Sequence, residues 1–165
     1  MAASNPTGAK AADRELIIER IFDAPRDVVF KAWTDPEHLA RWWGPNGCTL
    51  AVCETDFRPG GGWRFCMRLP DGFEEWQEGV YREIVEPERI VFTYSFPKGS
   101  RGFTEESAGK PGHQTIVTVN FSDHGGKTKL TLHQAVFETA AVRDDHVRGW
   151  NEALDHLASY VANRR

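Results

Sequence analysis

Apolar and polar residues alternate over most of this chain, which is the pattern of strands with one covered face. The clearest case lies at 62–69, where Trp63, Phe65 and Met67 alternate with two arginines and a cysteine. Turn-forming residues separate successive runs of this kind. The pattern predicts seven strands, at residues 15–22, 49–57, 62–69, 74–85, 89–96, 113–121 and 127–135.

Two short helices are predicted between the first and second strands. The segment 23–25 (Asp-Ala-Pro) places Asp23 or Ala24 at an N-cap and Pro25 at the first helical position. Asp35 and Pro36 repeat this start. The second helix is expected to carry Trp42 and Trp43 and to end at residues 44–47 (Gly-Pro-Asn-Gly), which break it.

The last element has a different period. Thr139 is a suitable N-cap, and apolar residues then recur at a spacing of three and four, which predicts one long amphipathic helix. These residues are Val147, Trp150, Leu154, Leu157 and Val161. The element order indicates an α+β fold in which a curved antiparallel sheet wraps around the C-terminal helix and the two short helices close one end. Residues 1–13 are expected to be a flexible tail, residues 14–165 a single domain, and residues 97–112 a long polar loop.

Composition and charge argue against several classes of function. The 165 residues carry a net charge of -4, which argues against a nucleic-acid binder, and no apolar run is long enough for membrane insertion. The N-terminus lacks the apolar core of a signal peptide, so a cytoplasmic location is expected. Three cysteines and six histidines show no zinc-type spacing, and neither a metal nor a cofactor is expected. The chain does contain many rings, with 10 Phe, 6 Trp and 3 Tyr.

If the inward rings do not fill the space between helix and sheet, they line an apolar cavity that can hold a small hydrophobic molecule. The candidate cavity residues are Trp42, Trp43, Trp63, Phe65, Met67, Trp76, Tyr81, Phe92, Tyr94, His133, Gly149, Trp150 and Leu154. A ring on a covered face more often belongs to an ordinary core, and the alternation around His133 also fits a solvent-facing side chain. Gly149 inside the helix indicates either close packing or room for a ligand. Six carboxylates are expected on a solvated face, namely Glu54, Asp56, Glu74, Glu75, Glu78 and Glu83.

Several short stretches, taken in order, resemble a known family. They are 22–26 (FDAPR), 29–36 (VFKAWTDP), 39–45 (LARWWGP), 57–61 (FRPGG), 79–84 (GVYREI), 87–91 (PERIV), 149–150 (GW) and 154–157 (LDHL). The series is similar to the START-like (SRPBCC) superfamily and, within it, to the activator of Hsp90 ATPase homologue-like proteins. The resemblance covers residues 15–162 and implies the helix-grip fold. Its relatives include lipid carriers, hormone and polyketide binders, aromatase/cyclases and chaperone regulators, so it implies the fold more firmly than the activity.

Three hypotheses follow. The favoured one is a protein that binds a small hydrophobic or aromatic molecule between helix and sheet. The second is a polyketide cyclase/dehydratase-like enzyme, which requires an inward His133 or Tyr81 with a buried charged partner, although no catalytic motif is recognisable. The third is a chaperone-linked interaction module, which the resemblance alone suggests. Chaperone activators have a large domain before the first strand, whereas only a short tail is expected here, which argues against this hypothesis. A homodimer is a further expectation.

Overall fold

The computed structural model describes residues 13–97 and 113–164. The predicted tail, except for Asp13, and the predicted loop, except for Pro97, lie outside the described residues. The elements are β1 (Leu16–Phe22), α2 (Arg26–Lys31), α3 (Pro36–Leu39), β2 (Thr49–Thr55), β3 (Gly62–Arg68), β4 (Glu74–Val85), β5 (Arg89–Tyr94), β6 (Thr115–His124), β7 (Lys127–Ala135) and α5 (Ala140–Ala162). The seven predicted strands are confirmed, with ends that differ by up to three residues.

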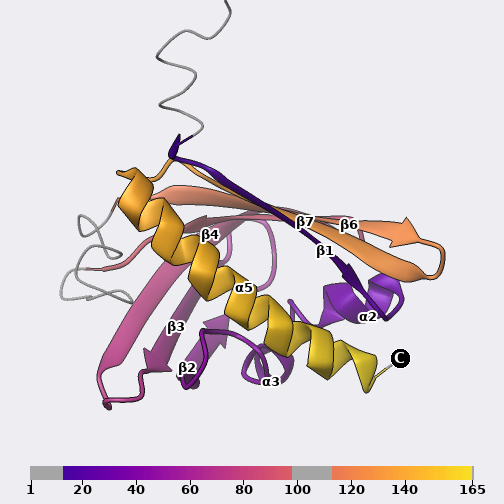
Figure 1. The fold of residues 1–165 in the computed structure, drawn as a ribbon, viewed down its shortest axis with the longest axis horizontal. Coiled ribbons are helices and arrows are strands. Elements are labelled where there is room, and N and C mark those ends of the chain that lie inside the picture. Colours follow the sequence, from indigo (N-terminus) through magenta and orange to yellow (C-terminus); the bar gives the residue numbers. More distant parts are fainter. Residues whose placement is uncertain (1–12, 98–112, 165) are drawn as a thin grey trace, which may run out of the picture.

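All strands belong to one antiparallel sheet in the order β1-β7-β6-β5-β4-β3-β2. The sheet curves, and α5 runs diagonally across its concave side (Figure 1). The inner face of the sheet and the apolar stripe of α5 therefore share one core. This is the α+β helix-grip fold that the sequence predicts.

The long helix begins as predicted, because the Thr139 hydroxyl accepts a hydrogen bond from the backbone N–H of Val142 at 3.2 Å. The two short helices differ from the prediction. Pro25, not Asp23 or Ala24, is the N-cap of α2, since the Pro25 carbonyl accepts the first helical hydrogen bonds. The helix α3 ends at Leu39, and Trp42 and Trp43 follow it in a turn.

Strand β4 pairs with β3 through residues 74–80 and with β5 through residues 81–85. At Gly79, a Cβ atom would overlap the Thr93 carbonyl and the Trp63 indole, so only glycine permits this approach. The Trp63 Nε1–H donates to the Thr93 carbonyl at 3.0 Å, and the N–H of Val80 donates to the Thr93 hydroxyl at 2.8 Å. These hydrogen bonds lie between the isolated bridge of Glu78 with Ser95 and the regular pairing of β4 with β5, whose register shifts between Tyr81 and Glu83.

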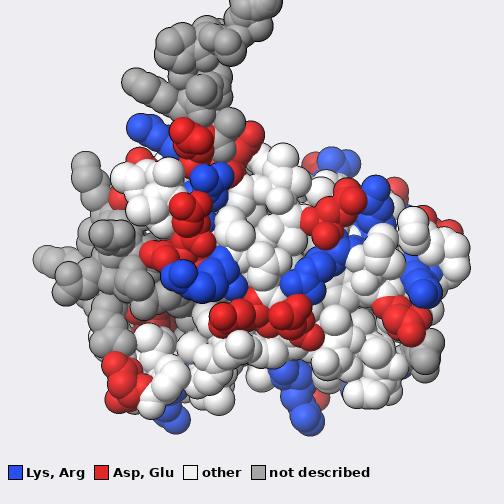
Figure 2. Space-filling view, in the orientation of Figure 1, with Lys and Arg blue, Asp and Glu red and all other residues white. Residues whose placement is uncertain are grey.

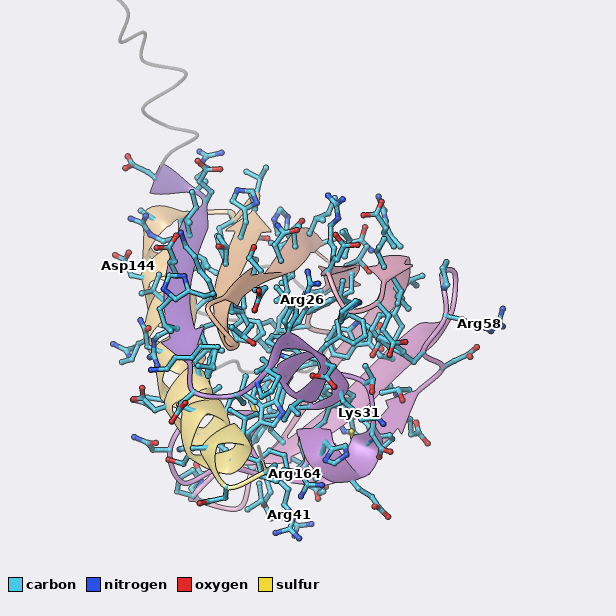
Figure 3. All side chains as sticks on the ribbon, turned by 90° about the vertical axis from the view of Figure 1, so that its right-hand side faces the viewer. Arg26, Lys31, Arg41, Arg58, Asp144 and Arg164 are labelled. Carbon is cyan, nitrogen blue, oxygen red and sulfur yellow. The ribbon has the colours of Figure 1, made fainter. Side chains whose placement is uncertain are left out.

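The helices α2 and α3 close one end of the fold, next to the C-terminal end of α5. His38 Nδ1 and the Tyr160 hydroxyl lie 2.5 Å apart and connect α3 to α5. Lys31, Arg41 and Arg164 lie at this end (Figure 3). Within residues 13–97 and 113–164, no helix is long and apolar enough to cross a membrane.

Candidate functional site

Aromatic rings from four parts of the fold meet between α5 and the sheet. The Trp150 ring of α5 stacks on Trp33 with a centroid separation of 6.0 Å and meets Trp43 edge-on at 5.3 Å. Trp43 in turn contacts Phe65 of β3 at 5.0 Å, and Phe65 lies 4.8 Å from Trp63. Edge-to-face pairs of this kind add roughly 0.5–1.5 kcal/mol each beyond the area they bury.

Two small pockets remain inside this cluster. The first has a volume of about 20 Å³ and is lined by Trp43, Gly44, Pro45, Met67, Gln77, Tyr94, His146, Gly149, Trp150 and Ala153. The second has a volume of about 10 Å³ and is lined by Trp33, Leu39, Trp43, Trp63, Phe65, Tyr81, Ile90 and Phe92. Each is about the size of one water molecule. The rings therefore nearly fill the space, and a larger molecule can enter only if side chains or the backbone move.

The two pockets bring together nine of the thirteen candidate residues. They are Trp43, Trp63, Phe65, Met67, Tyr81, Phe92, Tyr94, Gly149 and Trp150. Leu154 and Trp42 are buried but line neither pocket, and the Trp42 Nε1–H donates to the Ala32 carbonyl at 2.9 Å. The helix α5 is continuous through Gly149, which is buried.

The structure places two candidates on the outer face of the sheet. Trp76 is half-buried there, beneath the Arg64 guanidinium, whose central carbon lies 4.0 Å from the ring centroid. Its predicted inward position is wrong because its neighbours Glu75 and Gln77 are the inward residues of β4. His133 also points outward, and its Nε2 lies 2.9 Å from the Glu15 carboxylate. The prediction that Glu75 is solvated is wrong as well, since this side chain is fully buried.

Sequence reasoning missed the polar residues of the first pocket, Gln77 and His146. The Trp43 Nε1–H donates to the Gln77 side-chain carbonyl at 3.0 Å, which satisfies both groups away from water. His146 lies four residues before Trp150, so helical spacing from Trp150 back to Val142 could have placed it on the buried stripe of α5.

His146 is held as a neutral ring. Its Nδ1–H donates to the Val142 carbonyl at 2.9 Å, which leaves Nε2 as the nitrogen with the lone pair. Burial lowers the pKa of His146 from 6.5 to about 4, against smaller opposing effects of the Val142 hydrogen bond and Asp145. The Tyr94 ring lies 5.7 Å from that of His146, and burial, with a smaller effect of Glu75, raises the pKa of Tyr94 far above its ordinary range.

The indole groups of this cluster differ in their hydrogen bonds. The Trp150 Nε1–H donates to Gln134 at 2.7 Å, and the Gln134 amide donates to the Thr115 hydroxyl at 2.8 Å. The Trp33 Nε1–H is the exception among the described side chains, because it is buried and has no hydrogen-bond partner. An unpaired buried donor costs roughly 1–3 kcal/mol.

A surface groove adjoins the first pocket. It has a volume of about 170 Å³ and is lined by Pro45, Cys48, Leu69, Pro70, Asp145, Arg148, Gly149 and Glu152. Pro45 and Gly149 line both spaces, so they form the wall between interior and surface. Acidic and basic side chains are interspersed over the face of the molecule that α5 crosses (Figure 2). Within the described ranges, no three His, Cys, Asp or Glu side chains are grouped to hold a metal ion.

The family model described as "Activator of Hsp90 ATPase homolog 1-like protein" matches residues 23–162. No curated protein matches the chain significantly. Among solved structures, protein CV1439 from Chromobacterium violaceum is 29% identical, with a TM-score of 0.78, and the match covers 90% of this chain and 97% of that one.

The AHSA1 (SPO3351) protein from Silicibacter pomeroyi is 21% identical, with a TM-score of 0.77 and coverage of 92% and 99%. Protein NE0264 from Nitrosomonas europaea is also 21% identical, with a TM-score of 0.75 and coverage of 93% and 97%. At these identities the likeness shows the fold alone. The family match spans most of the domain, so the chain belongs to the activator of Hsp90 ATPase homolog 1-like family, of the START/SRPBCC type, and this membership supports a ligand-binding or related function.

Proposed function

We propose that this protein binds a small, mainly apolar molecule that carries a hydrogen-bond acceptor, in the space between α5 and the sheet. The observation that carries the proposal is the wall at Pro45 and Gly149, where a ring-lined interior pocket and an open surface groove adjoin. Gly149 contributes no side chain to the wall between the two spaces. A ligand that enters here displaces rings that already pack on one another, so its affinity depends on replacing those contacts.

The polar groups of the interior support the choice of ligand. Apolar pockets commonly use a few convergent polar groups to orient what they bind. The first pocket is lined by Gln77, whose side-chain amide carries N–H donors, and the second by Trp33, whose indole N–H has no partner. A carbonyl or ether oxygen on the ligand would satisfy that donor. An anionic ligand is disfavoured because no described Lys or Arg side chain lines either pocket.

The cyclase alternative required His133 or Tyr81 to point inward beside a buried charge. His133 lies on the outer face, and no described charged side chain lines the pocket that contains Tyr81. Neither residue therefore provides the expected acid–base pair, and binding is the function we retain.

Native mass spectrometry of the freshly purified protein tests the proposal, together with tryptophan fluorescence during titration with a panel of apolar aromatic ketones and ethers. The expected result is either a co-purified small molecule or a saturable change in fluorescence. Matched hydrocarbons of the same size should bind more weakly, because they leave the Trp33 N–H unpaired. A protein that is uniformly empty and whose fluorescence no panel member changes contradicts the proposal.

A further inference from the structure

The segment Gly44–Cys48 is fastened to α5 by side chains that neither pocket explains. The backbone N–H of Asn46 donates to the Glu152 carboxylate at 2.9 Å. The side-chain oxygen of Asn46 lies 2.7 Å from His156 Nε2, which donates to it because an amide oxygen only accepts. One residue of the segment thus receives two contacts from successive turns of α5.

We propose that Asn46, Glu152 and His156 form a latch that holds this segment closed over the passage between the surface groove and the interior pocket. This proposal rests on the proposed function, because a latch matters only if a ligand passes between the groove and the pocket. The new element is the identity of the residues that control this passage. They are positioning residues, because none of the three lines the interior pocket.

The placement of the segment supports this role. Gly44 and Pro45 line the interior pocket, whereas Pro45 and Cys48 line the groove, so the segment borders both spaces. The segment has no regular secondary structure, and only short hydrogen bonds within it, such as Cys48 N–H to the Pro45 carbonyl at 3.1 Å, give it internal support. The two contacts of Asn46 with α5 therefore add directly to what holds the segment in place.

The glycines at the two ends of the segment suit a hinge. Gly44 has φ +103° and Gly47 has φ +83°, conformations that other residues seldom adopt. A Cβ at Gly44 would also lie 2.9 Å from the Met67 sulfur, so the segment sits directly on the pocket lining. Movement about these glycines would open the pocket without disturbing a helix or strand.

The latch can be tested without any ligand, because Cys48 lies within the segment. Cys48 is half-buried and lines the groove, and burial, with a smaller effect of Glu152, raises the pKa of its thiol. Release of the segment would expose this thiol. We therefore suggest measuring the rate at which N-ethylmaleimide modifies Cys48, by peptide mass spectrometry, in the intact protein and in His156→Ala and Asn46→Ala variants.

Each variant leaves the charge of Glu152 in place, so the thiolate fraction of Cys48 is not changed through that residue. The Asp155→Asn variant is the matched control, because Asp155 lies next to His156 in sequence but pairs with Arg20 on the opposite edge. Cys53 and the buried Cys66 serve as internal controls for general loosening, since both lie in the sheet.

Loss of one hydrogen bond should accelerate the modification of Cys48 by roughly twofold to tenfold, with Cys53 and Cys66 unchanged. Rates equal to those of the intact protein and of Asp155→Asn overturn the latch. Equal acceleration at all three cysteines overturns it too, since this would be global destabilisation.

A second measurement separates the latch from the proposed function. The probe is 6-propionyl-2-(dimethylamino)naphthalene, an uncharged aromatic ketone, whose association is followed by stopped-flow fluorescence. Faster association in both latch variants supports control of entry, and equal association rates in every variant overturn it. If Cys48 reacts faster while the probe and the ligand panel bind to no variant, the restraint on the segment is established and the proposed function fails.

Discussion

Protonation of His146 should weaken the fold measurably below neutral pH. The ring is buried among Tyr94, Phe96 and Phe137. Its pKa is lowered from 6.5 to about 4. Between these two values the unfolded chain binds a proton that the folded protein does not, so stability falls as the pH falls. The contribution is complete above pH 6.5 and is lost progressively towards pH 4.

The size of the effect follows from the difference in pKa. A full difference of 2.5 corresponds to about 3 kcal/mol, reached below pH 4, and the loss at pH 5 is about 2 kcal/mol. Urea denaturation at pH 7, 6, 5 and 4.5 measures it, for the intact protein and for His146→Gln. Carboxylates titrate in both proteins, so the difference between the two curves isolates the histidine.

The intact protein should lose about 2 kcal/mol more than His146→Gln between pH 7 and pH 5. A titration of the His146 ring by NMR should likewise give a pKa well below 6.5. Parallel stability curves, together with a ring that titrates near 6.5, would refute the placement of a neutral histidine in the pocket wall.

Three further substitutions test the fold. Gly79→Ala should destabilise by about 3 kcal/mol in a denaturant titration, because its Cβ overlaps the carbonyl of the neighbouring strand. Gly62→Ala, in the adjacent strand β3, should cost less than about 1 kcal/mol, because the nearest atom to its Cβ would be the Gly79 carbonyl oxygen at 3.7 Å. Equal losses in the two variants would be evidence against the close approach at Gly79. Thr139→Ala should lower the free energy of unfolding by about 1 kcal/mol, measured by thermal unfolding, because α5 loses its N-cap, whereas Thr139→Ser should have almost no effect. An alanine variant as stable as the intact protein would be evidence against the cap. Trp150→Phe should lower the free energy of unfolding, measured by urea denaturation, by about 3 kcal/mol, because the buried Gln134 oxygen loses its donor. A decrease below about 1 kcal/mol would show that this hydrogen bond contributes little to stability.

The sequence predicted the fold well because each element has its own periodicity. The alternation of Trp63, Phe65 and Met67 follows from the two-residue repeat of a strand, and the structure buries all three. Thr139 was identifiable as a cap because its hydroxyl suits the exposed N–H groups of a helix start. The short helices were harder, since Pro25 fits both the N-cap and the first helical position.

The candidate site was less predictable because strand β4 contradicts the simple rule that rings face inward. The direction of β4 is set by its pairing with β3, in which Phe65 faces Gln77 and Cys66 faces Trp76. Directly opposed residues share a face, so Gln77 must point inward with Phe65. No property of Gln77 alone reveals this. Its burial depends on a donor from Trp43, which lies 34 positions away in the sequence.

Whether the interior is hollow depends on tertiary packing, which periodicity does not encode. The same rings can line a cavity or interlock, and here they interlock to leave only about 20 and 10 Å³. Most of the aromatic rings thus belong to a packed core, which has two irregular features. One is the unpaired Trp33 N–H, and the other is the thin wall at Gly149.

The central claim is that a small molecule enters among these rings, and the indole N–H signals of ¹⁵N-labelled protein test it most directly. On titration with the best-binding ketone or ether of the panel, we expect saturable shifts of the Trp33, Trp43 and Trp150 signals, with the largest at Trp33. The signal of Trp76, on the outer face, should stay unchanged. Shifts confined to Trp76, or no shift of any indole at saturating ligand, would contradict the account.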